Sequence, residues 1–155
     1  MTDQEFVLET LRKAGRAVAE QVQAEAPGMT GTELNGEAGY LPDFAEAVKT
    51  KNMLERKAGQ RDGFVCKALS GRVVRLIQNY DSAVYTQEPE GLPAQWAFVW
   101  SQDPAHALPF VALSTSPYGK GDCCTHNGHV WRSGQDGNVW APGTLNVKWE
   151  DLGAI

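Results

Sequence analysis

The sequence predicts an α+β protein in which an N-terminal helical segment is followed by two small antiparallel β modules in tandem. Apolar residues recur at helical spacing near the N-terminus. An Asn-Gly pair near the C-terminus separates two strand-like runs, and an earlier stretch repeats that pattern. With 155 residues, the chain has room for one medium domain or two small ones.

Residues 4–26 predict the N-terminal helix. Its apolar residues follow one another at spacings of three or four and form one narrow stripe: Val7, Leu11, Ala14, Val18 and Val22. Pro27-Gly28 ends it. A narrow stripe is typical of a coiled-coil seam, whereas a wide stripe docks on a globular core, so self-association and packing on its own chain both stay open. We assign residues 1–28 to attachment or oligomerisation.

Residues 29–60 predict a loop followed by a short helix. The stretch from 29 to 40 is glycine-rich and has little periodicity, which is typical of a loop. Asp43 is expected to N-cap a helix that runs to about Lys57, with Glu46 completing a capping box. The residues expected to face inward are Phe44, Val48 and Leu54.

The second β module is assigned to residues 113–155 and contains a strong hairpin signal. Asn127-Gly128 suits a type I′ turn, whose two central residues both need positive φ. Strands are therefore expected at 123–126 and 129–133, and a third short strand around Trp149. Counting outward from the turn places four side chains on one face of the hairpin: Cys124, His126, His129 and Trp131.

The first β module, with the linker that follows it, is assigned to residues 61–112. Cys66 parallels Cys124, and Ser70-Gly71 parallels the later turn. Each module also has a Pro that precedes a Trp by seven residues. An internal repeat with different loop lengths explains these parallels. The apolar residues of the linker indicate that it packs rather than floats: Trp100, Leu108 and Phe110.

The second module resembles a known family of small sugar-binding domains. The residues that carry the likeness are Tyr118-x-x-Gly121-Asp122, the Asn-Gly hairpin, a Pro-containing loop and Trp149-Glu-Asp-Leu-Gly. This pattern is similar to the chitin-binding modules of carbohydrate-binding families 5 and 12, although the family has Val where Cys124 stands. Asn138-x-Trp140-x-Pro142 is most similar to the copies found in bacteriophage tail or virion proteins.

The resemblance implies a platform of exposed aromatic rings that stack on sugar. Tyr118 matches the first aromatic of the platform. The second position falls in residues 134–137, which lack an aromatic, so Trp140 is the substitute. Arg132 and Gln135 are the nearest polar groups that could orient hydroxyls. The alternative is that Trp140 packs under the Pro-containing loop.

Charge and composition exclude several classes of function. The net charge is −5 and no basic patch stands out, which makes nucleic acid and anionic membranes poor partners. No apolar run is long enough to span a bilayer, and the first residues lack the apolar region of a signal peptide. Three cysteines do not make a disulfide framework.

Neither a catalytic site nor a metal site is predicted. Cys124, His126 and His129 offer three ligands on one face, but a fourth is not evident, and Cys124 is better explained as a small buried hydrophobe. No carboxylate pair has a spacing that suits glycoside hydrolysis, and no nucleophile elbow occurs. We therefore expect a non-enzyme without a cofactor.

The resulting expectation is a non-enzymatic phage protein located in the virion. It would bind bacterial surface polysaccharide or decorate the tail or head, with other virion proteins as partners. It would form a homo-oligomer, with a trimer favoured because similar phage fibres and decorations are often trimeric. One alternative is a purely structural tail, baseplate or capsid accessory protein without sugar binding. Another is a binding module split from a wall hydrolase.

Overall fold

The computed structural model describes residues 2–155 and has the predicted α+β architecture. The α-helices are α1 (Asp3–Glu25), α2 (Gly31–Gly36) and α3 (Phe44–Thr50). The strands are β1 (Val65–Lys67), β2 (Val73–Leu76), β3 (Trp96–Val99), β4 (Leu108–Pro109), β5 (Cys123–His126), β6 (His129–Ser133) and β7 (Trp149–Ala154). Short 3₁₀ helices lie at Ala26–Gly28, Ala38–Tyr40, Met53–Glu55, Pro89–Gly91 and Pro104–His106.

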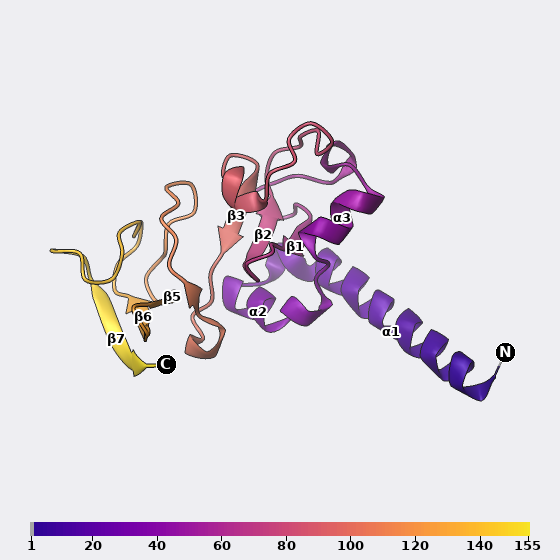
Figure 1. The fold of residues 1–155 in the computed structure, drawn as a ribbon, viewed down its shortest axis with the longest axis horizontal. Helices are drawn as coiled ribbons and strands as arrows, with labels where there is room; N and C mark the ends of the chain where they lie inside the picture. The colour runs from indigo at the N-terminus through magenta and orange to yellow at the C-terminus, as the bar shows by residue number, and fades with distance from the viewer. Residues whose placement is uncertain (1) are drawn as a thin grey trace.

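Helix α1 confirms the predicted N-terminal helix and projects from the body of the molecule (Figure 1). Thr2 caps its start through a capping box with Glu5, in which each side chain bonds the other residue's backbone N–H. Near its end, Val22 is buried in the core, and the side chain of Gln23 bonds both backbone groups of Val65 at the edge of the first sheet. The C-terminal end of α1 is therefore fixed to the body.

The segment between α1 and the first sheet differs from the expectation in two places. The expected loop contains α2, which Thr30 and Glu33 begin with a second capping box. The expected helix from Asp43 to Lys57 is much shorter, because the chain becomes extended at Lys51. The side chain of Asp43 makes no cap bond, so the expected capping box is absent there. The list of inward residues is also corrected, since Phe44 and Val48 pack inward but Leu54 is exposed and Met53 takes its place.

The first sheet has the antiparallel order β1-β2-β3 and is covered on both faces. One face packs around Trp96 and Phe98 of β3, together with Phe44 of α3. The other face packs Val65 and Val73 against α1, α2 and the segment that follows α2. Every residue of β2 is buried as a result. This sheet has no free face on which to bind a ligand.

The second sheet has the order β4-β5-β6-β7 and confirms the predicted hairpin. Asn127 and Gly128 have φ of 49° and 76°, and His126 pairs with His129 across the turn. The predicted third strand is β7, which begins at Trp149. The linker adds a strand that the sequence did not predict, since β4 pairs parallel with β5.

The two sheets share one register, as the internal repeat predicts. Each central strand follows its turn glycine, and the fifth residue after that glycine pairs with a tryptophan. Leu76 pairs with Trp96 in the first sheet, and Ser133 pairs with Trp149 in the second. The equivalent cysteines also occupy one position, because Cys66 pairs with Val74 and Cys124 with Trp131. Trp96 is fully buried, whereas Trp149 is only partly buried.

A column of aromatic rings joins the two sheets. Trp100 stacks on Tyr118 with ring centroids 4.2 Å apart and planes 12° apart. Phe98 of β3 continues the column on one side, and Phe110 continues it on the other. Trp149 of β7 meets Tyr118 edge to face at 5.5 Å. The linker therefore packs between the two sheets, as its apolar residues predicted.

Candidate functional site

The loop between β6 and β7 presents the exposed indole of Trp140. About half of this side chain is open to solvent, at 48% relative exposure. Its backbone is fixed from two sides: the Trp140 N–H donates to the Asn138 side chain at 3.2 Å, and its carbonyl accepts from Trp149 Nε1 at 2.8 Å. The exposed half of the indole contradicts full burial of Trp140 under the Pro142 loop.

Tyr118 does not form the other half of a sugar platform. Its side chain is 1% exposed, because it lies inside the aromatic column. Burial raises the pKa of its phenol, whose oxygen accepts from the Val111 N–H at 3.3 Å. Its backbone pairs with that of Asn138 through two hydrogen bonds. The expectation of an exposed Tyr118 is wrong, since both faces of its ring are occupied.

The two polar groups expected beside the platform already have other surroundings. Gln135 accepts from the Lys148 N–H at 2.9 Å, so its side chain closes the loop. Arg132 pairs with Cys123 in the sheet and lies on the face opposite Trp131. Burial raises the pKa of the Cys123 thiol, and the nearby charge of Arg132 offsets part of that rise.

The sheet register confirms the predicted shared face of the hairpin, which carries Cys124, His126, His129 and Trp131. Cys124 is fully buried, and burial raises the pKa of its thiol to about 12. His129 instead pairs with Asp151 of β7 at 3.0 Å. Within residues 2–155, no group of three or more His, Cys, Asp or Glu side chains is placed to hold a metal ion. Cys124 therefore packs as a small apolar residue.

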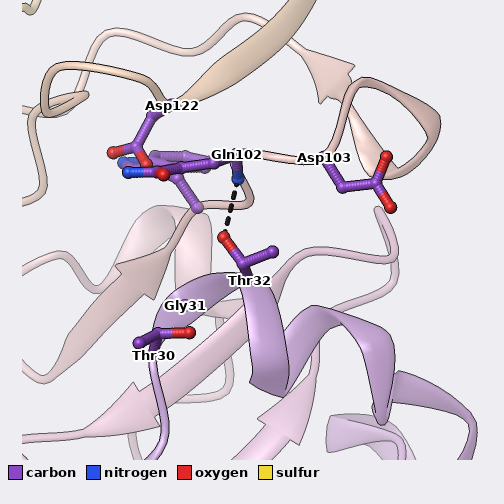
Figure 2. A pocket seen from close by; sticks show the side chains of 7 residues that line it. Thr30, Gly31, Thr32, Gln102, Asp103 and Asp122 are labelled. Atoms are coloured by element: carbon purple, nitrogen blue, oxygen red, sulfur yellow. Dashed lines mark hydrogen bonds between the residues drawn. The ribbon is translucent and has the colours of Figure 1, made fainter.

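A cleft of about 380 Å³ lies where α2, the linker and the second sheet meet. Figure 2 shows Thr32 at the start of α2 bonded to Gln102 of the linker, a contact of 2.9 Å from the Gln102 N–H. Asp122 faces the same cleft, and burial raises the pKa of its carboxyl group. That carboxylate accepts from the Gly119 N–H at 2.8 Å, and Asp103 accepts from Ala105. These polar groups already bond within the chain.

The projecting half of α1 exposes several large apolar side chains. Its apolar side chains are 46–63% exposed: Phe6, Val7, Leu8 and Leu11. Of the predicted oligomerisation residues, Val7, Leu11 and Ala14 lie on this free half. Val18 is half-buried and Val22 is buried in the chain's own core, so Val22 does not face a partner. None of the helices in the described chain is apolar and long enough to cross a bilayer.

Two residues of this surface were missed by the sequence prediction. Leu8 follows Val7 and Gly15 follows Ala14, so both flank the predicted stripe. A helical wheel that counts neighbours of the stripe, rather than only its strict repeat, would have included both. Leu8 widens the exposed apolar face, and Gly15 leaves it open, since a Cβ there would meet nothing within 4 Å.

Comparisons with protein-family models, with curated proteins and with solved structures found no match for this chain. The likeness to chitin-binding modules therefore stays a prediction drawn from the residues that carry it.

Proposed function

We propose that this chain is a non-enzymatic accessory protein of a bacteriophage virion, held in an assembly by α1 while its two sheets form the outward body. The observation that carries the proposal is the exposed apolar face of α1. A helix of about 12–15 residues, which is roughly the length of the projecting half of α1, is only marginally stable in water by itself. Contiguous apolar surface on such a helix is typical of a site that another protein covers.

The geometry favours a structural role over sugar binding. The first sheet is covered on both faces, and Tyr118 is buried. Trp140 is thus left without the second exposed ring that the resemblance requires. The purely structural alternative needs only the free face of α1 and a stable body, and both are present.

Incorporation into particles tests the proposal. The chain should be found by mass spectrometry in purified particles of the phage that encodes it. A Leu11→Asp substitution should remove it from the particles, because the new carboxylate would lie in the covered apolar face. The body should fold as before, since Leu11 is 62% exposed. Particles that never contain the wild-type chain would refute a virion role.

Glycan adhesion is a second candidate, favoured by one observation. Trp140 is exposed on a loop whose backbone is fixed by Asn138 and Trp149, and a fixed indole suits stacking on a sugar ring. Retention on insoluble bacterial polysaccharide measures it. Trp140→Ala should lose retention with an unchanged melting temperature, whereas Leu145→Ala should keep it. Leu145 is the matched control because it is an exposed apolar residue of the same loop. A wild-type chain that is not retained rules out this candidate.

A further inference from the structure

We infer that the partner covering the free face of α1 is a second copy of this chain, packed antiparallel so that Val7 of each copy lies against Leu11 of the other. The inference rests on the proposed function, because it names the partner of the same face. The resulting assembly has one twofold axis, which passes near Glu9 of both helices. It is a dimer with the two bodies at opposite ends.

The first argument is that the body of the chain lies on the same side of α1 as its free apolar face. One row runs along the helix: Val7, Leu11, Ala14, Val18 and Val22. The last two residues of this row pack in the core cluster that also contains Leu34 and Leu41. The free face at Val7 and Leu11 is therefore the outward continuation of a face that the body already covers.

This placement disfavours any parallel bundle. In a parallel dimer or trimer, the same row of every copy faces the bundle axis. Because each body packs on that row at Val18 and Val22, all the bodies would point toward the axis from the same end. They would compete for one space, and the helices would have to diverge after Ala14. The trimer expected from the phage resemblance has this arrangement.

An antiparallel pair avoids the collision. Helix α1 begins at Asp3, and the capping box at Thr2 marks its N-terminal end. When Val7 lies opposite Leu11 of the second copy, the first residue of that copy's helix lies opposite Gly15. A Cβ added to Gly15 would meet nothing within 4 Å, so there is space for the incoming helix end. The second helix thus stops before the covered part of the row, and both bodies stay clear of it.

The charge order along α1 favours the same orientation. The first part of the helix is acidic, with Asp3, Glu5 and Glu9, and the next part is basic, with Arg12, Lys13 and Arg16. Antiparallel packing places Glu5 level with Lys13 of the other copy and Glu9 level with its own counterpart at the twofold axis, whereas parallel packing places every charge level with its own counterpart. Lys13 already pairs with Glu9 of its own helix at 3.7 Å. At helical spacing these charges, apart from Asp3, project from the side of α1 away from the seam, so they make no contact across it. They favour the antiparallel order only through their summed field, an effect that salt weakens.

The mass in solution tests the pairing. Sedimentation velocity of the full chain should show a concentration-dependent dimer, because a seam this short associates weakly. Leu11→Asp should weaken the association constant by about tenfold or more, since it places two carboxylates in the apolar seam. Phe6→Asp is the matched control, because Phe6 is equally exposed but lies about 140° around the helix from Leu11. It should leave the dimer intact. A wild-type monomer, a trimer, or equal effects of the two substitutions would overturn the inference.

Cross-linking tests the orientation. A Val7→Cys chain and a Leu11→Cys chain, one with a tag that changes its mass, are mixed and oxidised mildly. The antiparallel pair should give the mixed disulfide in excess of either homodimer, and a parallel pair should give the two homodimers. The native cysteines Cys66, Cys123 and Cys124 are all buried, so they add little background. Predominant homodimers would overturn the antiparallel inference but leave assembly through α1 standing, whereas absence of the wild-type chain from purified particles would refute the proposed virion role separately.

Discussion

Replacing Tyr118 by Ala tests whether the aromatic column holds the two sheets together. The ring stacks between Trp100 at 4.2 Å and Phe110 at 5.5 Å, and Trp149 meets its edge. Truncation of a large buried aromatic side chain costs about 3–5 kcal/mol. For a chain of this size, each kcal/mol shifts the melting temperature by about 2–4 °C, so the variant should melt about 6–20 °C lower.

Thermal unfolding followed by near-UV circular dichroism measures both parts of this expectation. The signal of the stacked Trp100 should weaken along with the melting temperature. Tyr85→Ala is the matched control, because Tyr85 is 54% exposed and makes the same chemical change at the surface. It should change stability by less than about 0.5 kcal/mol. If Tyr118→Ala has the same melting temperature as Tyr85→Ala, the aromatic column does not stabilise the fold.

Three further substitutions or treatments test particular features of the fold. Gly128→Ala should cost about 1–2 kcal/mol in urea unfolding because the turn needs φ of 76°, whereas Gly36→Ala, without positive φ, should cost nothing. Burial raises the pKa of the Cys66 and Cys124 thiols, so they should react with a thiol reagent only after the chain unfolds. The free energy of unfolding should fall as pH rises past the ordinary thiol pKa of about 8.5. Rapid reaction of these thiols in the folded chain would contradict this. Burial also raises the pKa of Asp122, so the free energy of unfolding should fall as pH rises from the ordinary carboxyl value through the raised pKa. Asp122→Asn should therefore melt higher than the wild type at neutral pH and lose this advantage in acid, and a lower melting temperature at neutral pH would contradict the assignment.

Sequence reasoning worked best where local chemistry decides the structure. The Asn127-Gly128 turn determines its own backbone angles, and those angles set the register of β5 and β6 on either side. The repeat could be found for the same reason, because the seven-residue spacing from Pro89 to Trp96 lies within one short segment of the chain and can be counted in the sequence. Helix α1 was found because its periodicity extends over many turns.

Sequence reasoning failed where short segments or distant partners decide. Helix α2 has only six residues, too few for an apolar period, although Thr30 and Glu33 form a capping box that was readable in the sequence. Tyr118 was expected at the surface because the resemblance considers one module alone. Its burial depends on Trp100, which the linker carries over from the first sheet. No pattern within the second module contains that partner.

The differences between the two sheets determine where function can lie. The shared register provides both sheets with a buried cysteine at the same position, Cys66 and Cys124. Only the first sheet has α1, α2 and α3 packed on it, and this cover fills both its faces. The second sheet is instead closed on one side by the aromatic column. Two of the places with exposed apolar side chains are the loop between β6 and β7 and the projecting half of α1, and they lie at opposite ends of the molecule (Figure 1). Because the body covers the C-terminal part of the α1 row, a partner bound there must approach from the N-terminal end, which the antiparallel pair does.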